Sequence, residues 1–313
     1  MSIAFVFPGQ GSQAVGMGKA LAEQFASARA VFDEVDAALG QKLSDLMWNG
    51  PEDQLTLTEN AQPALMAVSM AVVRVLEAEH GITMKRARCV AGHSLGEYSA
   101  LAAAGAFSLA DAARLLKIRG KAMQAATPVG TGAMAALLGL DFATAALVAA
   151  EAAQGDVCQA ANDNSDGQVV VSGHKAAVER ALDIAKAKGA KRAILLPVSA
   201  PFHCALMQPA ADAMAAALAT AQVNIPVVPV ISNVMVGPVS DPTVIRQKLV
   251  EQVTGTVRWR ECVAAMMAMG VTTFVELGAG KVLTGLARKN AAEAKALAIG
   301  GPDDFAAALE FLK

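Results

Sequence analysis

The chain has 313 residues, of which 54% are hydrophobic and 17% charged, and its formal net charge is −2. This length can form one large or two smaller domains, and the balanced charge argues against nucleic acid as a partner. The apolar run 129–150 contains Asp141 and falls short of the roughly 18 uninterrupted residues of a membrane span, so we expect no membrane association. The N-terminus lacks the basic start of a signal peptide and reaches Pro8 early, which predicts a cytoplasmic protein.

The cysteines give no sign of a metal or redox site. They lie far apart, at Cys89, Cys158, Cys204 and Cys262. No C-x-x-C pair occurs, and no histidine stands at a zinc-like spacing from them. The pattern predicts reduced thiols that are mostly structural.

The first third of the chain alternates strand and helix patterns. The apolar run 3–7 ends at Pro8-Gly9-Gln10-Gly11, which predicts a buried strand followed by a tight loop. Helical patterns follow over about 18–38 and 61–80, and 89–93 is the next expected strand. This order predicts an α/β layer with parallel pairing of the strands.

The first loop also fits the dinucleotide-binding pattern G-x-G-x-x-G/A, over residues 9–14. A nucleotide site of that kind needs an acidic residue about 20 positions further on, at the end of a second strand. Asp33 and Glu34 instead lie within a helical pattern. We therefore expect the N–H groups of this loop to face a neighbouring strand end, where open α/β sheets bind ligands.

The segment Gly92-His93-Ser94-Leu95-Gly96 follows the second expected strand and has the G-x-S-x-G pattern of a nucleophile elbow. Glycines on both sides let the backbone turn sharply, and the serine hydroxyl then lies at the N-terminus of the next helix. N–H groups there can stabilise an oxyanion, as acyl transfer through serine requires. The pattern also arises by chance, so its place between strand and helix is what favours acyl chemistry at Ser94.

The middle of the chain predicts a separate small domain. One expected helix ends near Ala104, and a second begins after Ser108, which with Asp111 forms a capping box. Between about 129 and 198 the patterns then run β-α-β-β-α-β, which is the ferredoxin-like order. We expect this segment to be inserted into a large α/β domain formed by residues 1–128 and 199–313.

After the insertion the chain is predicted to rejoin the first layer. The patterns indicate a helix from about residue 204, a strand over 227–231, helices over 242–252 and 260–269, and a final strand over 273–277.

A serine nucleophile needs a base, and the chain has four histidines. His80 ends a helix, His93 directly precedes the serine, and His174 lies in a turn of the small domain. His203 lies in the loop where the chain re-enters the large domain, a common position for catalytic side chains, although a purely structural role stays open. Arg119, on the second helix after the elbow, is either a surface residue or a ligand for a substrate carboxylate.

Taken together, the segments 7–13 and 92–97, Arg119-Gly120 with Met123, and Pro201-Phe202-His203 resemble the malonyl-CoA:acyl carrier protein transacylases. These are the stand-alone acyltransferases of bacterial type II fatty-acid synthesis, and the resemblance runs from residue 3 to about residue 290. It implies an α/β-hydrolase-like large domain with a ferredoxin-like insert. It also implies ping-pong transfer of malonyl from malonyl-CoA to the phosphopantetheine thiol of holo acyl carrier protein, through a malonyl-serine.

The resemblance also implies a role for each of six residues. These are Ser94 as nucleophile, His203 as general base and acid, the N–H groups of Gln10 and Leu95 as the oxyanion hole, Arg119 as the malonyl carboxylate ligand, and the main-chain carbonyl of Gln252 as the group that orients the histidine. No metal or redox cofactor is implied, and we expect a monomer.

Two residues depart from the pattern of the family. Ala279 stands where proline is common, and Phe202 precedes the histidine where some members have serine. Three alternatives stay open: a serine hydrolase, a related acyltransferase such as a malonate decarboxylase subunit or polyketide loading enzyme, and a non-enzymatic carrier-binding module. Lys186, Lys188, Lys191 and Arg192 form either a contact patch for an acidic carrier protein or a solvated helix end.

Overall fold

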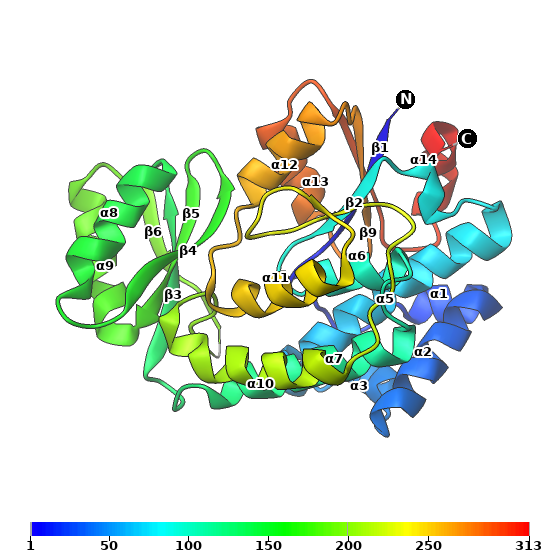
Figure 1. Cartoon of the computed structure of the whole chain (residues 1–313), viewed down its shortest axis with the longest axis horizontal. Helices are drawn as coiled ribbons and strands as arrows, with labels where there is room; N and C mark the ends of the chain where they lie inside the picture. Colours follow the sequence, from blue (N-terminus) through cyan, green and yellow to red (C-terminus); the bar gives the residue numbers. More distant parts are fainter. Residues whose placement is uncertain (1, 199, 313) are drawn as a thin grey trace.

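The structure, a computed structural model, describes residues 2–198 and 200–312. Two sheets with their helices lie side by side, and Figure 1 shows the antiparallel one at the left. The large sheet contains, from edge to edge, β10 (Lys295–Ile299), β9 (Thr273–Leu277), β1 (Ile3–Phe7), β2 (Cys89–Gly92), β7 (Val230–Ile231) and β8 (Pro238–Val239). Neighbouring strands are parallel except for β7 and β8.

The centre of the large sheet is buried on both faces. All five residues of β1 are buried, and they alternate between two hydrophobic clusters: Ile3, Phe5 and Phe7 in one, Ala4 and Val6 in the other. Continuous apolar strands of this kind are typical of a parallel sheet that helices cover on both sides. The apolar run that predicted a buried first strand therefore gives the central strand of the domain.

Helices cover both faces of this sheet. Outside the small domain they are α1 (Lys19–Gln24), α2 (Ala26–Leu39), α3 (Leu43–Asn49), α4 (Glu52–Thr56), α5 (Thr58–His80), α6 (Gly96–Ala103), α7 (Leu109–Ala125), α10 (Gln208–Thr220), α11 (Pro242–Thr254), α12 (Trp259–Ala268), α13 (Val282–Asn290) and α14 (Asp304–Leu312). Figure 1 shows α12 and α13 on one side, and α2, α5 and α7 on the other. By length and composition α5 could cross a membrane, but 83% of its most apolar window is buried, so it is the central core helix here.

The small domain has the predicted ferredoxin-like topology. Its elements are β3 (Gly132–Leu138), α8 (Phe142–Ala153), β4 (Cys158–Ser165), β5 (Gln168–His174), α9 (Lys175–Ala187) and β6 (Arg192–Leu195). The sheet order is β4-β5-β3-β6, with every neighbouring pair antiparallel, and α8 and α9 pack on it through one apolar cluster. The predicted fold class, an α/β-hydrolase-like large domain with a ferredoxin-like insert, is thus confirmed.

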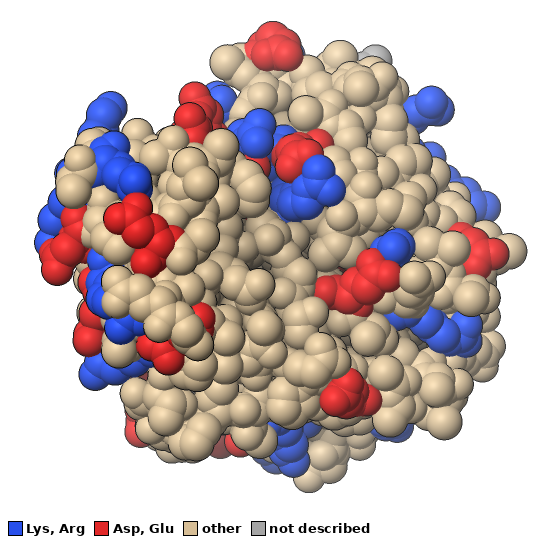
Figure 2. All heavy atoms as spheres, turned by 60° about the vertical axis from the view of Figure 1, so that its left-hand side comes forward, with Lys and Arg blue, Asp and Glu red and all other residues tan. Residues whose placement is uncertain are grey.

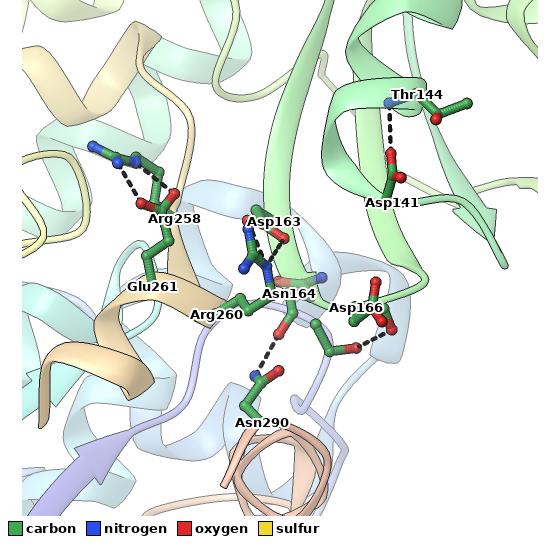
Figure 3. Close-up of polar contacts among 10 residues, drawn as sticks. Asp141, Thr144, Asp163, Asn164, Asp166, Arg258, Arg260, Glu261 and Asn290 are labelled. Carbon is green, nitrogen blue, oxygen red and sulfur yellow. Dashed lines mark hydrogen bonds and ion pairs between the residues drawn. The ribbon is translucent and has the colours of Figure 1, made fainter. Parts of the chain in front are cut away.

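Strand β4 attaches the small domain to the large one. The buried carboxylate of Asp163 forms an ion pair with Arg260 of α12, at 2.8 Å between Oδ2 and Nη2, and Asn290 of α13 donates to the carbonyl of Asn164 (Figure 3). Val257 also exchanges main-chain hydrogen bonds with Ala161 and Asp163. These contacts hold the small domain beside the carboxyl end of β2, where the elbow lies.

The structure corrects three of the expected elements. The expected helix over 18–38 is two helices, because Phe25 is extended and its ring packs on Phe305. The expected strand over 227–231 shrinks to two residues, since Pro229 has no N–H to donate to a strand ladder. The helix expected from about residue 204 begins at Gln208, after a short 3-10 turn.

Candidate active site

The backbone turns sharply at the serine of the G-x-S-x-G segment. Ser94 has a φ of 54°, in the left-handed region that side chains other than glycine rarely adopt. A Cβ on Gly92 would lie 1.8 Å from the Gly96 carbonyl oxygen, and one on Gly96 would lie 2.2 Å from that of Phe7. Both glycines are therefore required by close packing of the turn, which sets the serine between β2 and α6.

His203 lies against this serine from a loop 109 residues further on. Its Nε2 is 2.8 Å from Ser94 Oγ, and its Nδ1 is 2.9 Å from the main-chain oxygen of Gln252. A carbonyl can only accept, so the proton is on Nδ1, and Nε2 is free to accept the serine proton. The geometry is that of a nucleophile and a base whose ring is held by a third group.

Burial keeps the His203 imidazole neutral. Removal from water and the nearby Arg119 cation lower the pKa of His203 to about 3, although its hydrogen bond to Gln252 opposes the shift. Because the neutral form is the one that accepts a proton, the base is present at neutral pH and is lost only in strong acid.

This pKa predicts that the His203 ring does not titrate between pH 8 and pH 5. Nitrogen NMR of protein labelled at histidine should show one neutral tautomer, protonated on Nδ1, throughout that range. The spectrum of a His203→Asn variant assigns the signal. A midpoint near 6.5, the usual value for histidine, would contradict the buried and neutral base.

Arg119 lies inside the protein, not on its surface. Its side chain is 1% exposed, and the guanidinium donates to Ser94 Oγ at 3.1 Å, to Gln252 Oε1 at 2.8 Å and to Gln62 Oε1 at 2.8 Å. It also lies over the ring of Tyr98, 5.6 Å from the centroid. A buried cation beside the serine oxygen can bind an anionic substituent of an acyl group.

The expected oxyanion donors lie at the same strand ends. Gln10 follows β1, Leu95 follows Ser94, and both residues line the cavity that contains the serine. Within residues 2–198 and 200–312, no hydrogen bond is donated by either main-chain N–H. A Cβ on Gly9 would lie 2.8 Å from the His93 carbonyl oxygen, so the first loop packs directly against the elbow as expected. Two unpaired N–H groups near the serine are suited to an oxyanion.

The cavity has a volume of about 720 Å³ and lies between the two domains. Ser94, His203 and Arg119 line it from the large domain, and Met134 of β3 and Leu196, which follows β6, line it from the small domain. Within the described residues, no three histidine, cysteine or acidic side chains form a group that could hold a metal ion.

The structure therefore brings all six predicted site residues together, and it adds others that the sequence reasoning missed. Asn233 accepts from the main-chain N–H of Ser94 at 2.8 Å and donates to the carbonyl of Gly92. Glu97 accepts from the side chain of Gln252, and Gln62 accepts from the guanidinium of Arg119. The only sequence signal for Asn233 is a polar pair, Ser232-Asn233, directly after a buried strand.

The possible carrier-binding patch is partly neutralised. Lys186 pairs with Asp183 at 3.1 Å and Lys188 pairs with Glu151 at 2.9 Å. Figure 2 shows lysine and arginine side chains intermingled with acidic ones at the left of that view. The four basic residues therefore carry less net positive charge than their number suggests.

The fold and this site define an α/β enzyme that can carry an acyl group on serine. In a comparison with protein families, residues 4–301 match the acyl transferase domain. The chain belongs to this acyl transferase family.

Individual relatives are similar over nearly their whole length. The malonyl CoA-acyl carrier protein transacylase of Escherichia coli K12 is 50% identical over 307 residues, which cover 98% of each chain. That of Bacillus subtilis 168 is 47% identical and covers 99% of this chain and 97% of the relative. The crystal structure of acyl-carrier-protein-S-malonyltransferase from Bartonella henselae is 59% identical, with a TM-score of 0.97 and coverage of 100% and 99%.

A further solved structure contains a carrier protein. It is a malonyl-transacylase in complex with a type II PKS acyl-carrier protein, and the transacylase is 45% identical to this chain, with a TM-score of 0.96. The match covers 99% of this chain and 100% of that one.

Proposed function

We propose that this protein transfers the malonyl group from malonyl-CoA to the phosphopantetheine thiol of holo acyl carrier protein, in fatty-acid synthesis. The observation that carries the proposal is the buried Arg119 guanidinium, 3.1 Å from the oxygen of a serine in an elbow. A cation at that distance can bind the free carboxylate of a malonyl group whose thioester carbon faces the serine. The names of the relatives agree with this substrate and this acceptor.

In the first half-reaction His203 Nε2 takes the proton of Ser94 Oγ while the oxygen attacks the thioester carbon of malonyl-CoA. The N–H groups of Gln10 and Leu95 stabilise the negative charge that develops on the carbonyl oxygen. When the carbon–sulfur bond breaks, His203 gives its proton to the departing thiolate. Malonyl-Ser94 and coenzyme A are the products.

The second half-reaction reverses this sequence with a different thiol. His203 removes the proton of the phosphopantetheine thiol, and the sulfur attacks the ester carbon of malonyl-Ser94. Collapse of the intermediate returns the proton to Ser94 and releases malonyl-carrier protein. Arg119 holds the malonyl carboxylate throughout, which fixes the ester in place and limits the approach of water to it.

The proposal includes four further expectations. The protein uses no metal or redox cofactor, acts as a monomer, binds neither nucleic acid nor membrane, and works in the cytoplasm. Both half-reactions need only side-chain and main-chain groups of the protein, the malonyl thioester and the acceptor thiol. Activity that persists in EDTA, together with a one-chain mass in solution, is the expected result.

One assay separates transfer from its alternatives. The protein is mixed with malonyl-CoA, with and without holo acyl carrier protein, and both malonyl-carrier protein and free malonate are followed. We expect rapid malonyl-carrier formation and slow malonate release, with no dependence on added metal. Malonate released equally fast without carrier protein would identify a hydrolase, and formation of neither malonyl-carrier protein nor malonate would identify a binding module.

A further inference from the structure

A buried carboxylate lies behind the site, where it touches none of the reacting atoms. Glu97, in the first turn of α6, is 2% exposed. Its Oε2 accepts from the side-chain amide of Gln252 at 2.7 Å and from the main-chain N–H of Asn233 at 3.1 Å. These partners are 155 and 136 residues away in the chain. The carboxylate thus connects α6, α11 and the segment after β7.

The Gln252 side chain has one allowed orientation because of its neighbours. Its Oε1 accepts from Arg119 Nη2 at 2.8 Å, while its Nε2 donates to Glu97 and, at 3.0 Å, to the main-chain oxygen of Ser94. A guanidinium can only donate and a carboxylate can only accept, so the amide cannot be reversed without losing both contacts. One amide group therefore lies between the buried cation and the buried anion.

The same residue also orients the base. The main-chain oxygen of Gln252 accepts from His203 Nδ1 at 2.9 Å, and Gln252 is completely buried in the last turns of α11. The main chain of Gln252 therefore holds the imidazole and its side chain holds the guanidinium, so a displacement of this residue alters both contacts. Displacements of this kind are costly in catalysis, because rate depends steeply on the placement of reacting groups.

A second connection runs from Glu97 to the elbow. Asn233, whose N–H binds Glu97, accepts from the N–H of Ser94 through its side-chain oxygen and donates to the Gly92 carbonyl through its nitrogen. The side chain of Asn233 thus spans the strained turn at Ser94. A serine whose backbone is in the left-handed region persists only where the surrounding structure holds it there.

We propose that Glu97 is a positioning residue for acyl transfer: by fixing Gln252 and Asn233, its carboxylate sets His203, Arg119 and Ser94 relative to one another. The inference rests on the acyl transfer proposed above. Gln252 and Asn233 both donate to the Glu97 carboxylate, so the ionised form fits the site. Burial raises the pKa of Glu97 to about 7, against the opposing effects of its donors and of Arg119, so experiments at pH 8 keep it ionised.

The variant Glu97→Gln keeps the size of the side chain and removes the charge. Malonyl-CoA is mixed with enzyme at pH 8 and quenched at millisecond intervals, and the rate of acyl-enzyme formation is measured. We expect that rate to fall by about ten- to a hundredfold, the cost of slightly misplaced reacting groups. The apparent KM for malonyl-CoA should change less than the maximal rate.

The matched control is Glu276→Gln. Glu276 is also a fully buried carboxylate, but it accepts from Leu283 and Thr284 at the start of α13 and does not line the cavity. This variant should form the acyl-enzyme within about twofold of the wild-type rate. An equal loss in both variants would mean that any buried carboxylate matters equally, and would overturn the inference.

A double-mutant cycle tests whether Glu97 acts through Gln252. Gln252→Ala removes the amide and keeps the main-chain carbonyl. If Gln252 carries the effect, Glu97→Gln lowers the rate by less than about threefold in the Gln252→Ala background, because the connection is already broken. Losses that multiply both in this cycle and in the same cycle with Asn233→Ala, or a Glu97→Gln enzyme as fast as wild type, would overturn the inference.

A shorter acid provides the second variant. If Glu97→Gln does not fold, Glu97→Asp, which keeps the charge but loses reach, enters the same cycle with the same expected pattern. The wild-type enzyme separates failure of the proposed acyl transfer from failure of the role of Glu97. Wild-type protein that forms no acyl-enzyme would contradict the proposed acyl transfer. Wild-type protein and Glu97 variants that form it equally fast would contradict only the positioning role of Glu97.

Discussion

The Ser94→Ala protein should retain no malonyl label after incubation with radiolabelled malonyl-CoA. The hydroxyl oxygen of Ser94 is hydrogen-bonded to the proposed base, 2.8 Å from His203 Nε2. Its removal leaves no group at that position that can form an ester. Loss of a serine nucleophile commonly lowers the maximal rate by about a millionfold. Transfer to the carrier protein should fall at least about ten-thousandfold, and acid-quenched wild-type protein should carry one malonyl group on the peptide that contains Ser94.

Ser99→Ala is the matched control for that experiment. Ser99 lies in α6, five positions after Ser94, and is completely buried. This variant should be labelled like wild type and transfer malonyl at a similar rate. A stable label on Ser94→Ala would show that another residue carries the acyl group, and the assignment of the elbow serine would then be wrong.

The elbow was predictable because its determinants are local. A strand, a turn that tolerates only glycine at two positions, and a helix follow one another within residues 89–103, and each has its own short-range pattern. The small domain was predictable for the same reason, since its alternating strands and amphipathic helices lie in uninterrupted order. The expected ferredoxin-like sheet forms over residues 132–195.

The edges of the large sheet were predicted less well. Strand β10 was missed, because Lys295–Ile299 reads KALAI within an alanine-rich stretch that resembles a helix. Its pairing with β9 is a long-range effect that overrides local preference. For β7 the error is the opposite: the apolar stretch 227–231 resembles a full strand, but it contains Pro229, and only two residues form the strand.

The partners of the serine could not be chosen from the residues alone. His203 meets Ser94 only because the chain returns to the sheet 109 residues later, and no local pattern distinguishes it from a structural histidine. Glu97 and Asn233 are ordinary polar residues in sequence, and their importance arises from contacts between distant segments. The resemblance to a family assigned roles to His203 and Arg119, which the residues alone left open, and added Gln252, while Glu97, Asn233 and Gln62 came from the structure.

The burial of Arg119 has a packing cause that the sequence contains but does not reveal. Gly120 lies against α5, where an added Cβ would come within 2.5 Å of the Glu59 Cα atom. The close approach of α7 to α5 places the neighbouring arginine inside the protein, so that its guanidinium reaches Gln62 and Ser94 instead of solvent. A sequence reading that treats most helical arginines as surface residues misses this effect.

Arg119 should determine the choice between malonyl and acetyl groups. Arg119→Ala should lower the rate of acyl-enzyme formation from malonyl-CoA by about a hundredfold or more, because a charge-assisted pair with a buried carboxylate is commonly worth about 2–5 kcal/mol. With acetyl-CoA, which has no free carboxylate, the loss should stay below about tenfold. Some loss of rate with acetyl-CoA should remain, because the guanidinium also donates to Ser94 Oγ and Gln252 Oε1 in the free enzyme.

Rapid-quench measurements with both thioesters give the two rates, and Arg119→Lys is the matched control. Lysine keeps the charge but cannot form two parallel hydrogen bonds, so its malonyl rate should lie between those of wild type and Arg119→Ala. Equal losses for malonyl and acetyl would mean that the guanidinium supports only the serine and the glutamine. Selection of malonyl would then have to come from the cavity wall, where Met134 and Phe202 lie, and not from charge.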